Sequence, residues 1–267
     1  MSELNTIVLS STRLMRVCLS LLLLLTLSAC VTTQRGGFDK EVSTDEAIAS
    51  RVNAAKQYLQ SRNFEAARRH LKIAYELDPK SADVHDALAL IFQFSSEYEL
   101  AEFHYKNALD FGEGESRYRF NYANFLFQQK RFLEAEEQLQ AIVKDSLYEK
   151  RELGLVMLGL SQQQLLEAAK AQRSFERALI LNPRNTRALR ELSIMNYEAK
   201  NFPDAWRYFQ SYRKVVSRPD AELLLLGIEL ARELNDANAE ASYALALKNL
   251  YPDSREYEGY LRRQQYE

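Results

Sequence analysis

Residues 55–79 read AKQYLQSRNFEAARRHLKIAYELDP, and this stretch decides the fold. It holds a small residue at Ala55, an alanine twelve positions later at Ala67, and a large apolar residue at Leu71. Two helices joined by a short turn pack closely where side chains are small, and Leu71 lies one turn beyond Ala67 on the same helix face. Pro79 then ends the second helix, because proline has no amide hydrogen to donate. The stretch therefore predicts a helix-turn-helix pair.

The same arrangement recurs along the chain with a period of about 34 residues. The alanines of the second helices are separated by 34, 34, 36, 34 and 34 residues: Ala67, Ala101, Ala135, Ala171, Ala205 and Ala239. The small residues of the first helices are Ala55, Ala89, Ala123, Gly159, Ser193 and Gly227. The large residues that follow the alanines are Leu71, Tyr105, Leu139, Phe175, Phe209 and Tyr243. This pattern resembles the tetratricopeptide repeat (TPR).

We therefore expect an all-α protein, a right-handed TPR superhelical solenoid of six helix-turn-helix repeats with a C-terminal capping helix. The expected boundaries are a lipoprotein signal peptide over 1–29, a lipidated cysteine and flexible tether over 30–44, six repeats over 45–252, and the capping helix over 253–267. The repeats are placed at approximately 48–81, 82–115, 116–149, 152–185, 186–219 and 220–252.

The two ends of the solenoid differ in this prediction. Before the first repeat, residues 45–50 are expected to form only a short turn. After the last repeat, Asp253 is the expected N-cap of the capping helix, and Tyr257, Tyr260 and Leu261 form a face that covers the repeat. Such a cover is needed because an open solenoid end exposes apolar surface.

The N-terminus has the order of an export signal: basic residues, an apolar run and then small residues. Arg13 and Arg16 precede the mostly apolar run 17–27, which is too short for an ordinary transmembrane helix. Residues 27–30 read LSAC and resemble the bacterial lipobox, in which the cysteine, here Cys30, receives diacylglycerol and acyl chains. Whether the chain starts at Met1 or Met15 stays open.

Cys30 is interpreted as an anchor and not as a redox group. Cys18 lies inside the leader, so no second cysteine remains after cleavage to form a disulfide. By resemblance to sorted bacterial lipoproteins, Val31 in place of an aspartate implies the outer membrane, with the protein lipid-anchored and facing the periplasm. Residues 31–44 are polar and include two glycines, which predicts a tether with a reach of about 20 Å.

Neither the charge nor the motifs indicate catalysis or nucleic-acid binding. The net charge is -2 with no basic patch, so nucleic acid is not an expected partner. His70, His85 and His104 fall in different predicted helices and are interpreted as surface or packing residues. Glu134, Glu136 and Glu137 are interpreted as a solvated helix face. We predict no catalytic residue, metal, cofactor or small-molecule substrate, and hence no enzyme.

The first helices offer a stripe of side chains to a partner, spaced at i, i+4 and i+7 from one another. The candidate groove residues in the first half are Val52, Lys56, Leu59, Leu90, Phe94, Phe120, Asn124 and Phe127. These residues either bind a partner or are buried between repeats, and the pattern leaves both open; for Leu224 and Ile228 in the last repeat it favours burial. The stripe is largely apolar and lacks a set of Lys, Asn and Arg that grips a peptide carboxylate, so an apolar or amphipathic segment is the expected ligand.

Several local strings go beyond the generic repeat: ADVHDALA at 82–89, FLFQQKRF at 125–132, DSLY at 145–148, LLLGI at 224–228 and LYP at 250–252. Together with the lipobox and six repeats they resemble the pilotins of the PilF/PilW kind, TPR outer-membrane lipoproteins of type IV pilus biogenesis and stability. The resemblance implies binding of the pilus secretin, its outer-membrane localisation and multimerisation, and hence twitching motility. It also implies a partner surface on the early repeats.

Two other functions stay open at this point. One is a TPR lipoprotein of outer-membrane barrel assembly, which usually has five repeats and lacks the string at 145–148. The other is an adaptor that docks a periplasmic cell-wall enzyme. Recovery of the bound partner distinguishes the three.

Overall fold

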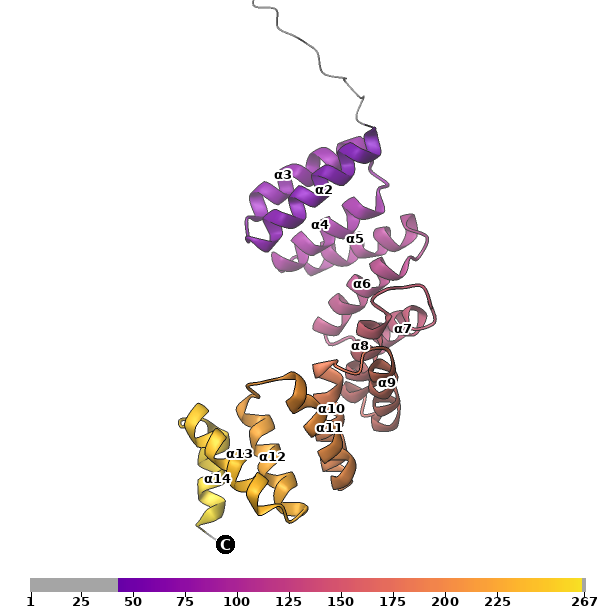
Figure 1. Ribbon diagram of the computed structural model, residues 1–267. Helices are drawn as coiled ribbons and strands as arrows, with labels where there is room; N and C mark the ends of the chain where they lie inside the picture. Colours follow the sequence, from indigo (N-terminus) through magenta and orange to yellow (C-terminus); the bar gives the residue numbers. More distant parts are fainter. Residues whose placement is uncertain (1–42, 266–267) are drawn as a thin grey trace, which may run out of the picture. The chain divides into compact units, whose positions relative to one another are not determined.

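Residues 43–265 are described by a computed structural model, and their helices belong to one compact unit, Thr44–Glu267. All regular secondary structure in this part of the chain is helical, and Figure 1 shows the helices following one another in pairs. The first helices of the six pairs are α2 (Thr44–Gln60), α4 (Ala82–Phe94), α6 (Ser116–Gln128), α8 (Arg151–Gln164), α10 (Thr186–Glu198) and α12 (Ala221–Glu233). The second helices are α3 (Phe64–Leu77), α5 (Tyr98–Phe111), α7 (Phe132–Ile142), α9 (Ala168–Leu181), α11 (Phe202–Val215) and α13 (Ala237–Leu250). The last helix is α14 (Arg255–Gln264). The predicted all-α TPR solenoid of six pairs and a terminal helix is thus confirmed.

Each helix packs on its partner in the pair and on the next pair. First helices also contact the following first helix, as α2 does with α4, α4 with α6 and α6 with α8. Each second helix contacts its partner and the first helix of the next pair, as α3 does with α4 and α5 with α6. This is the expected result of stacking helix pairs that bury no complete core alone.

The columns of small and large residues pack as the sequence predicts. Gly159 lies so close to Phe175 that an added Cβ would be 2.6 Å from the phenyl Cε1 atom. The alanine column is fully buried from Ala67 to Ala205. The large residues after it, such as Phe175 and Phe209, are fully buried as well. Small residues therefore set the separation of the helices, and large ones fill the space between them.

The turn inside each pair is closed by a residue with positive φ. These residues are Arg62, Ser96, Lys130, Leu166, Lys200 and Asn235. A left-handed residue just after the C-cap of a helix lets the next amides bond back to the last carbonyls of that helix. None of the six is glycine, so the sharp turn is made at some backbone cost, which the packing of the two helices offsets.

The structure differs from the predicted boundaries at both ends. Thr44, which we placed in the tether, begins α2, and residues 45–50 are helical instead of forming a turn. Ile48 is buried one turn before Val52, which gives the extension an apolar contact. At the other end the N-cap of α14 is Ser254, whose hydroxyl accepts from the Tyr257 amide, and not Asp253. Cys30, the leader and most of the tether lie outside the described residues.

The irregular spacing after Ala135 has a clear structural origin. The helix α7 has 11 residues, whereas each of the other five second helices has 14. A longer connection then runs from Val143 to Lys150 before α8 begins. Asp145 organises it, because its carboxylate accepts from the Ser116 hydroxyl at 2.6 Å and from the Leu147 amide at 3.1 Å.

The sixth repeat is shifted by one residue relative to the other five. Its turn residue Asn235 comes 35 positions after Lys200, although Ala239 follows Ala205 by 34. Ala239 is consequently only half-buried, and the buried position near the end of α13 is Leu247. The shift is tolerated because no further pair packs on this one; instead α14 packs on α12.

Candidate protein-interaction site

The predicted groove residues divide into three groups by burial. Val52 and Leu59 are core residues of the first repeat, at 3% and 8% exposure, so they offer a partner almost no surface. Phe94 is 60% exposed. The remaining five are half-buried between neighbouring first helices: Lys56, Leu90, Phe120, Asn124 and Phe127. The burial reading thus holds for Val52 and Leu59, whereas partner binding at the other residues of the stripe stays a prediction.

The half-buried aromatic residues of the stripe also hold the repeats together. Phe120 and Phe127 pack against the large central core, and Leu90 packs against both this core and the N-terminal one. Phe127 meets Phe132 at 5.2 Å between ring centroids, and Phe94 meets Phe64 at 5.9 Å. Of these residues, Phe94 has the largest free surface for a partner.

Polar residues fix the stripe across repeats two and three. Gln93 accepts from the Tyr105 hydroxyl at 2.6 Å and donates to Gln128 at 2.8 Å. Gln128 in turn donates to Asn124 at 3.2 Å. Asn124, a predicted groove residue, is therefore engaged in an amide chain that joins α4 and α6.

Asp86 is a buried acid within the stripe. The Asn121 amide donates to both carboxylate oxygens, at 2.8 and 3.0 Å. Burial raises the pKa of Asp86, while the Asn121 hydrogen bond and the positive charge of Lys56 act against this rise. The positive charge of Lys56 thus acts on Asp86, an interaction that the sequence pattern did not suggest.

In the later part of the stripe, some side chains form ion pairs and others are fully buried. Arg190 pairs with Glu191, Asp220 and Glu222. Leu224 and Ile228 are fully buried, which confirms the burial favoured for them. Other apolar residues of the later half are half-buried, as are Leu90, Phe120 and Phe127 in the first half: Leu160, Ile194 and Tyr197. The predicted groove residue that is clearly exposed is Phe94, in the first half.

Exposed aromatic side chains are concentrated in the first two repeats. Among the described residues, the large exposed aromatics all fall between positions 58 and 111: Tyr58, Tyr75, Phe94, Tyr98, Phe103 and Phe111. Beyond this range the large exposed hydrophobic residues are aliphatic. We call these six the N-terminal aromatic set. Five of the six escaped the sequence analysis, which followed only the predicted groove stripe, and four lie on the second helices α3 and α5.

Two histidines that the sequence places in separate helices meet inside the second repeat. Nδ1 of His85 lies 2.8 Å from Nδ1 of His104, and Nε2 of His85 lies 3.0 Å from the Pro79 carbonyl oxygen. Burial lowers the pKa of both, that of His104 to about 4 with a further contribution from His85. The interpretation as packing residues fits this geometry. His85 and His104 are 19 residues apart in the sequence. Arg51 and His70, at the same positions one repeat earlier, have the same separation and also meet. This spacing is the sequence feature that could have indicated the pair.

The prediction of a solvated position is wrong for one carboxylate. Glu136, placed with Glu134 and Glu137 on a solvated face, is only 4% exposed. Its Oε1 accepts from the Gln162 amide at 2.9 Å and from the Gln140 amide at 3.2 Å. The sequence could not show this because Gln162 is supplied by the next repeat.

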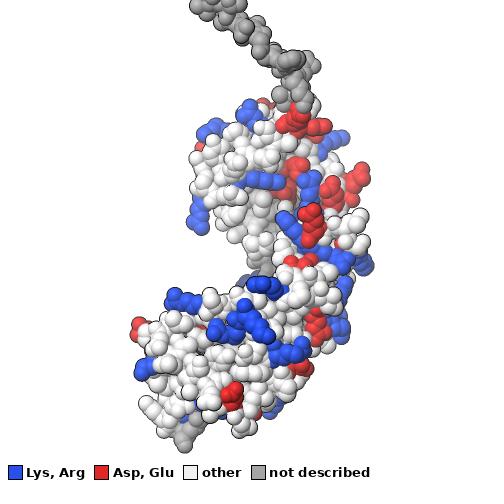
Figure 2. Space-filling model, viewed as in Figure 1, with Lys and Arg blue, Asp and Glu red and all other residues white. Residues whose placement is uncertain are grey.

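The described residues contain no cluster of three or more His, Cys, Asp or Glu side chains that could hold a metal ion. Within the same residues no helix combines the length and apolarity needed to cross a bilayer. Figure 2 shows Lys and Arg side chains interspersed with Asp and Glu on the face that it presents.

Comparisons with known proteins agree with this architecture. A tetratricopeptide repeat family model matches residues 156–222. The type IV pilus assembly protein PilF of Pseudomonas aeruginosa is 36% identical over 244 residues, covering 91% of this chain and 96% of that protein. A solved structure of Pseudomonas aeruginosa PilF matches with a TM-score of 0.76 at 36% identity, covering 82% of this chain and 99% of that one. PilW, described as a widely conserved type IV pilus biogenesis factor, shares the fold with a TM-score of 0.70 at 24% identity, covering 81% and 99%.

Proposed function

Because the chain belongs to the family of the type IV pilus assembly protein PilF, we propose that it acts as a pilotin, a lipid-anchored scaffold that binds secretin subunits of the pilus. In this proposal it brings these subunits to the outer membrane and promotes their multimerisation, and so supports pilus biogenesis and twitching motility. The relationship to PilF along nearly the whole of both chains is the observation that carries the proposal. The role is one of protein interaction and assigns no chemical step to any residue.

The anchor in this proposal is Cys30. Acylation at the lipobox cysteine supplies more than one acyl chain, and two membrane signals suffice for stable anchoring. A tether between Cys30 and α2 then lets the helical unit reach a partner near the membrane. The periplasmic face of the outer membrane is the proposed location.

The binding surface in this proposal is the first half of the stripe together with the N-terminal aromatic set. Aromatic residues provide much of the energy of protein interfaces, because they bury a large area at low cost in side-chain entropy. Phe94 belongs to both groups and is the most exposed of the predicted groove residues. An apolar or amphipathic segment of the secretin is the proposed ligand.

The anchor is tested by replacing Cys30 with serine. We expect secretin to be lost from the outer-membrane fraction and its multimers to fall about tenfold or more, because a serine hydroxyl is not a substrate for lipidation. Cys18→Ser is the matched control, since Cys18 lies inside the leader and should leave both measurements unchanged. Normal secretin multimers in the Cys30→Ser strain would contradict the proposed role of the anchor.

The partner is tested by affinity recovery from membranes with the full chain as bait. We expect the secretin subunit to be recovered. Recovery of barrel-assembly subunits, or of a periplasmic cell-wall enzyme, without secretin would favour one of the two alternative functions and contradict the pilotin proposal.

A further inference from the structure

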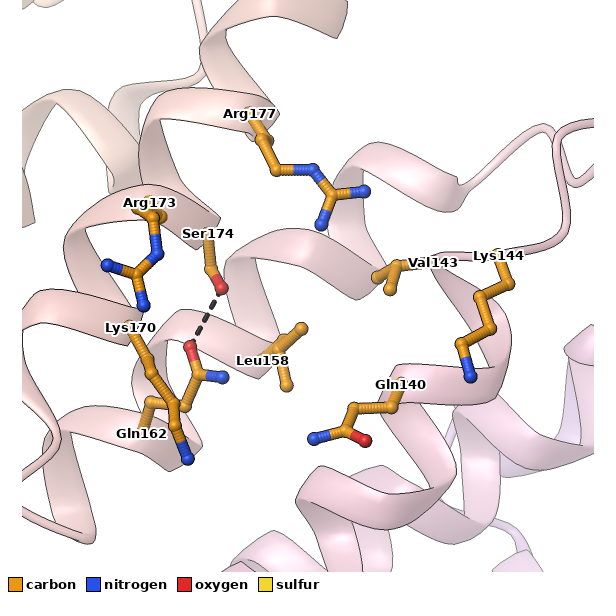
Figure 3. Close-up of a pocket in the computed structure, with 9 residues that line it drawn as sticks. All are labelled: Gln140, Val143, Lys144, Leu158, Gln162, Lys170, Arg173, Ser174 and Arg177. Atoms are coloured by element: carbon orange, nitrogen blue, oxygen red, sulfur yellow. Dashed lines mark hydrogen bonds between the residues drawn. The ribbon is translucent and has the colours of Figure 1, made fainter.

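A pocket of about 370 Å³ lies between α7, α8 and α9, away from the stripe of the first helices (Figure 3). Its inner wall is made of buried side chains from all three segments. Val143 and Leu158 form the apolar part, and Gln162 and Ser174 the polar part. Neither the stripe nor the proposed secretin contact uses this pocket.

Four cationic side chains line the pocket. Lys170, Arg173 and Arg177 are spaced by three and four residues on α9, so they share one face of that helix. Lys144 follows the end of α7. Figure 3 shows the charged ends of Arg177 and Lys144 on the two sides of Val143. No aspartate or glutamate is among the residues that line the pocket.

Most of this positive charge has no anionic partner. Lys170 pairs with Glu167 at 2.7 Å. Within the described part of the chain, Lys144, Arg173 and Arg177 make no salt bridge or side-chain hydrogen bond. Arg173 also acts electrostatically against the charge of Lys170. The four cations are exposed to water, so their mutual repulsion is modest, but their shared positive potential favours an anionic ligand at the pocket.

The polar wall behind the cations is held in place by a buried network. The Ser174 hydroxyl donates to Oε1 of Gln162 at 2.7 Å, and the Gln162 amide donates to Glu136 at 2.9 Å. Glu136 forms no salt bridge with the four cations, although its negative charge, together with that of Glu167, acts on Lys170. The wall is therefore preformed, and ligand binding needs to order only the exposed charged ends.

We propose that this cationic pocket binds an acidic segment of a protein partner. The cations on α9 are spread over about 10 Å along the helix, and Lys144 adds a fourth cation from a second segment. Such a spread suits several carboxylates spaced along a peptide. A single phosphate group is instead held by donors that converge on one point. Val143 and Leu158 offer contact to the methylene groups of glutamate or to an interleaved apolar side chain. The proposal goes beyond the pilotin role and does not require the partner to be the secretin.

The proposal is tested with the purified full chain and a fluorescent peptide of alternating glutamate and leucine. The whole chain carries a net charge of -2, so its overall field does not attract an acidic peptide and binding reports a local site. We expect saturable binding that weakens with salt, and no binding of a matched lysine-leucine peptide. Arg173→Glu with Arg177→Glu should weaken binding at least about tenfold.

The matched control is Lys214→Glu with Lys248→Glu, which changes the net charge equally at two exposed lysines outside the pocket. It should change the affinity less than about twofold. Circular dichroism of both double variants checks that the helices are retained. The proposal is overturned if the wild-type chain does not bind the acidic peptide, if the control loses binding to the same extent, or if inorganic phosphate or phosphatidylglycerol vesicles bind the pocket and the peptide does not. None of these measurements involves secretin, so failure here is distinct from failure of the pilotin proposal.

Discussion

At the scale of single residues, the spacing of two helices in the fourth repeat depends on Gly159. Alanine is normally better than glycine inside a helix by about 1 kcal/mol. Here its Cβ would lie 2.6–2.9 Å from the Phe175 ring, which is fully buried and cannot move away freely. Overpacking of this kind costs about 1–3 kcal/mol, so the clash outweighs the gain in helix propensity.

We therefore expect Gly159→Ala to lower the free energy of unfolding by about 1 kcal/mol, measured by urea titration. Gly259→Ala on α14 is the matched control, because nothing lies within 4 Å of the added Cβ. The control should be neutral or stabilising. Equal stabilisation by both substitutions would show that the two helices of the fourth repeat are not in close contact at Gly159.

The histidine pair of the second repeat has one consistent protonation pattern. The Pro79 carbonyl can only accept, so Nε2 of His85 carries the hydrogen in the bond between them. Nδ1 of neutral His85 is then an acceptor, and Nδ1 of His104 donates to it. The surrounding rings of Tyr75, Phe92 and Phe111 are uncharged, and Asp78 is the acidic group that acts on His85. A second proton on His85 would destroy this bond.

This pattern predicts acid sensitivity. The pKa of His104 is lowered from 6.5 to about 4 in the folded state, so the unfolded chain binds the proton first as pH falls. The contribution to stability is complete above pH 6.5 and is lost as pH falls toward 4. It amounts to on the order of 1–2 kcal/mol, because the His104 ring is partly exposed. Urea unfolding at pH 7.5 and pH 4.5 measures it. His104→Phe should reduce the difference and His70→Gln should not; an unchanged difference in His104→Phe would rule out the pair as its source.

At the scale of elements, α14 closes the end of the solenoid. It contacts α12, and its residues Tyr257 and Tyr260 pack with the buried Leu224, Ile228 and Leu247. Without this helix those apolar side chains would face water on one side. A terminal cover is what a stack of repeats needs, because each repeat buries its core only against neighbours.

We expect Tyr257→Ala with Tyr260→Ala to lower the free energy of unfolding by about 2–4 kcal/mol. Amide exchange should rise in α12 before it rises in the central helices, since the loss is local. Leu261, which we predicted on the covering face, is exposed and does not belong to this cluster. Leu261→Ala is therefore the control, and we expect less than about 0.5 kcal/mol from it. Loss of stability without faster exchange in α12 would mean that α14 does not act as a cap.

The columns of Ala67 and Leu71 were sufficient to predict the helix pairs, because helix packing depends on local side-chain size at regular spacing. Other features depend on partners from distant positions. Glu136 is buried by an amide 26 residues away, and the sixth repeat shifts at Asn235 without disturbing the spacing of the alanines. The candidate site was predicted only in outline, since Val52 and Phe94 belong to one sequence pattern but differ in burial.

At the scale of the whole molecule, different surfaces are carried by different repeats. The first two repeats hold the N-terminal aromatic set, the third and fourth hold the cationic pocket, and the sixth is closed by α14. In a solenoid each repeat contacts only its neighbours, so a change on one of these surfaces leaves distant repeats intact. Substitutions can therefore assign binding to a part of the chain without unfolding the rest.

This separation allows a direct test of the proposed secretin contact. Phe94→Asp places a charge at the most exposed predicted groove residue, and we expect it to reduce secretin recovery about tenfold or more, as at an interface hot spot. Ile180→Asp on α9 is the matched control, because Ile180 is 78% exposed but lies in the fourth repeat. It should leave recovery unchanged. Because the Phe94 ring also packs against Phe64, thermal unfolding must show that Phe94→Asp keeps its helices. A folded Phe94→Asp variant with normal recovery, or equal loss in both variants, would place the secretin contact outside the first half of the stripe.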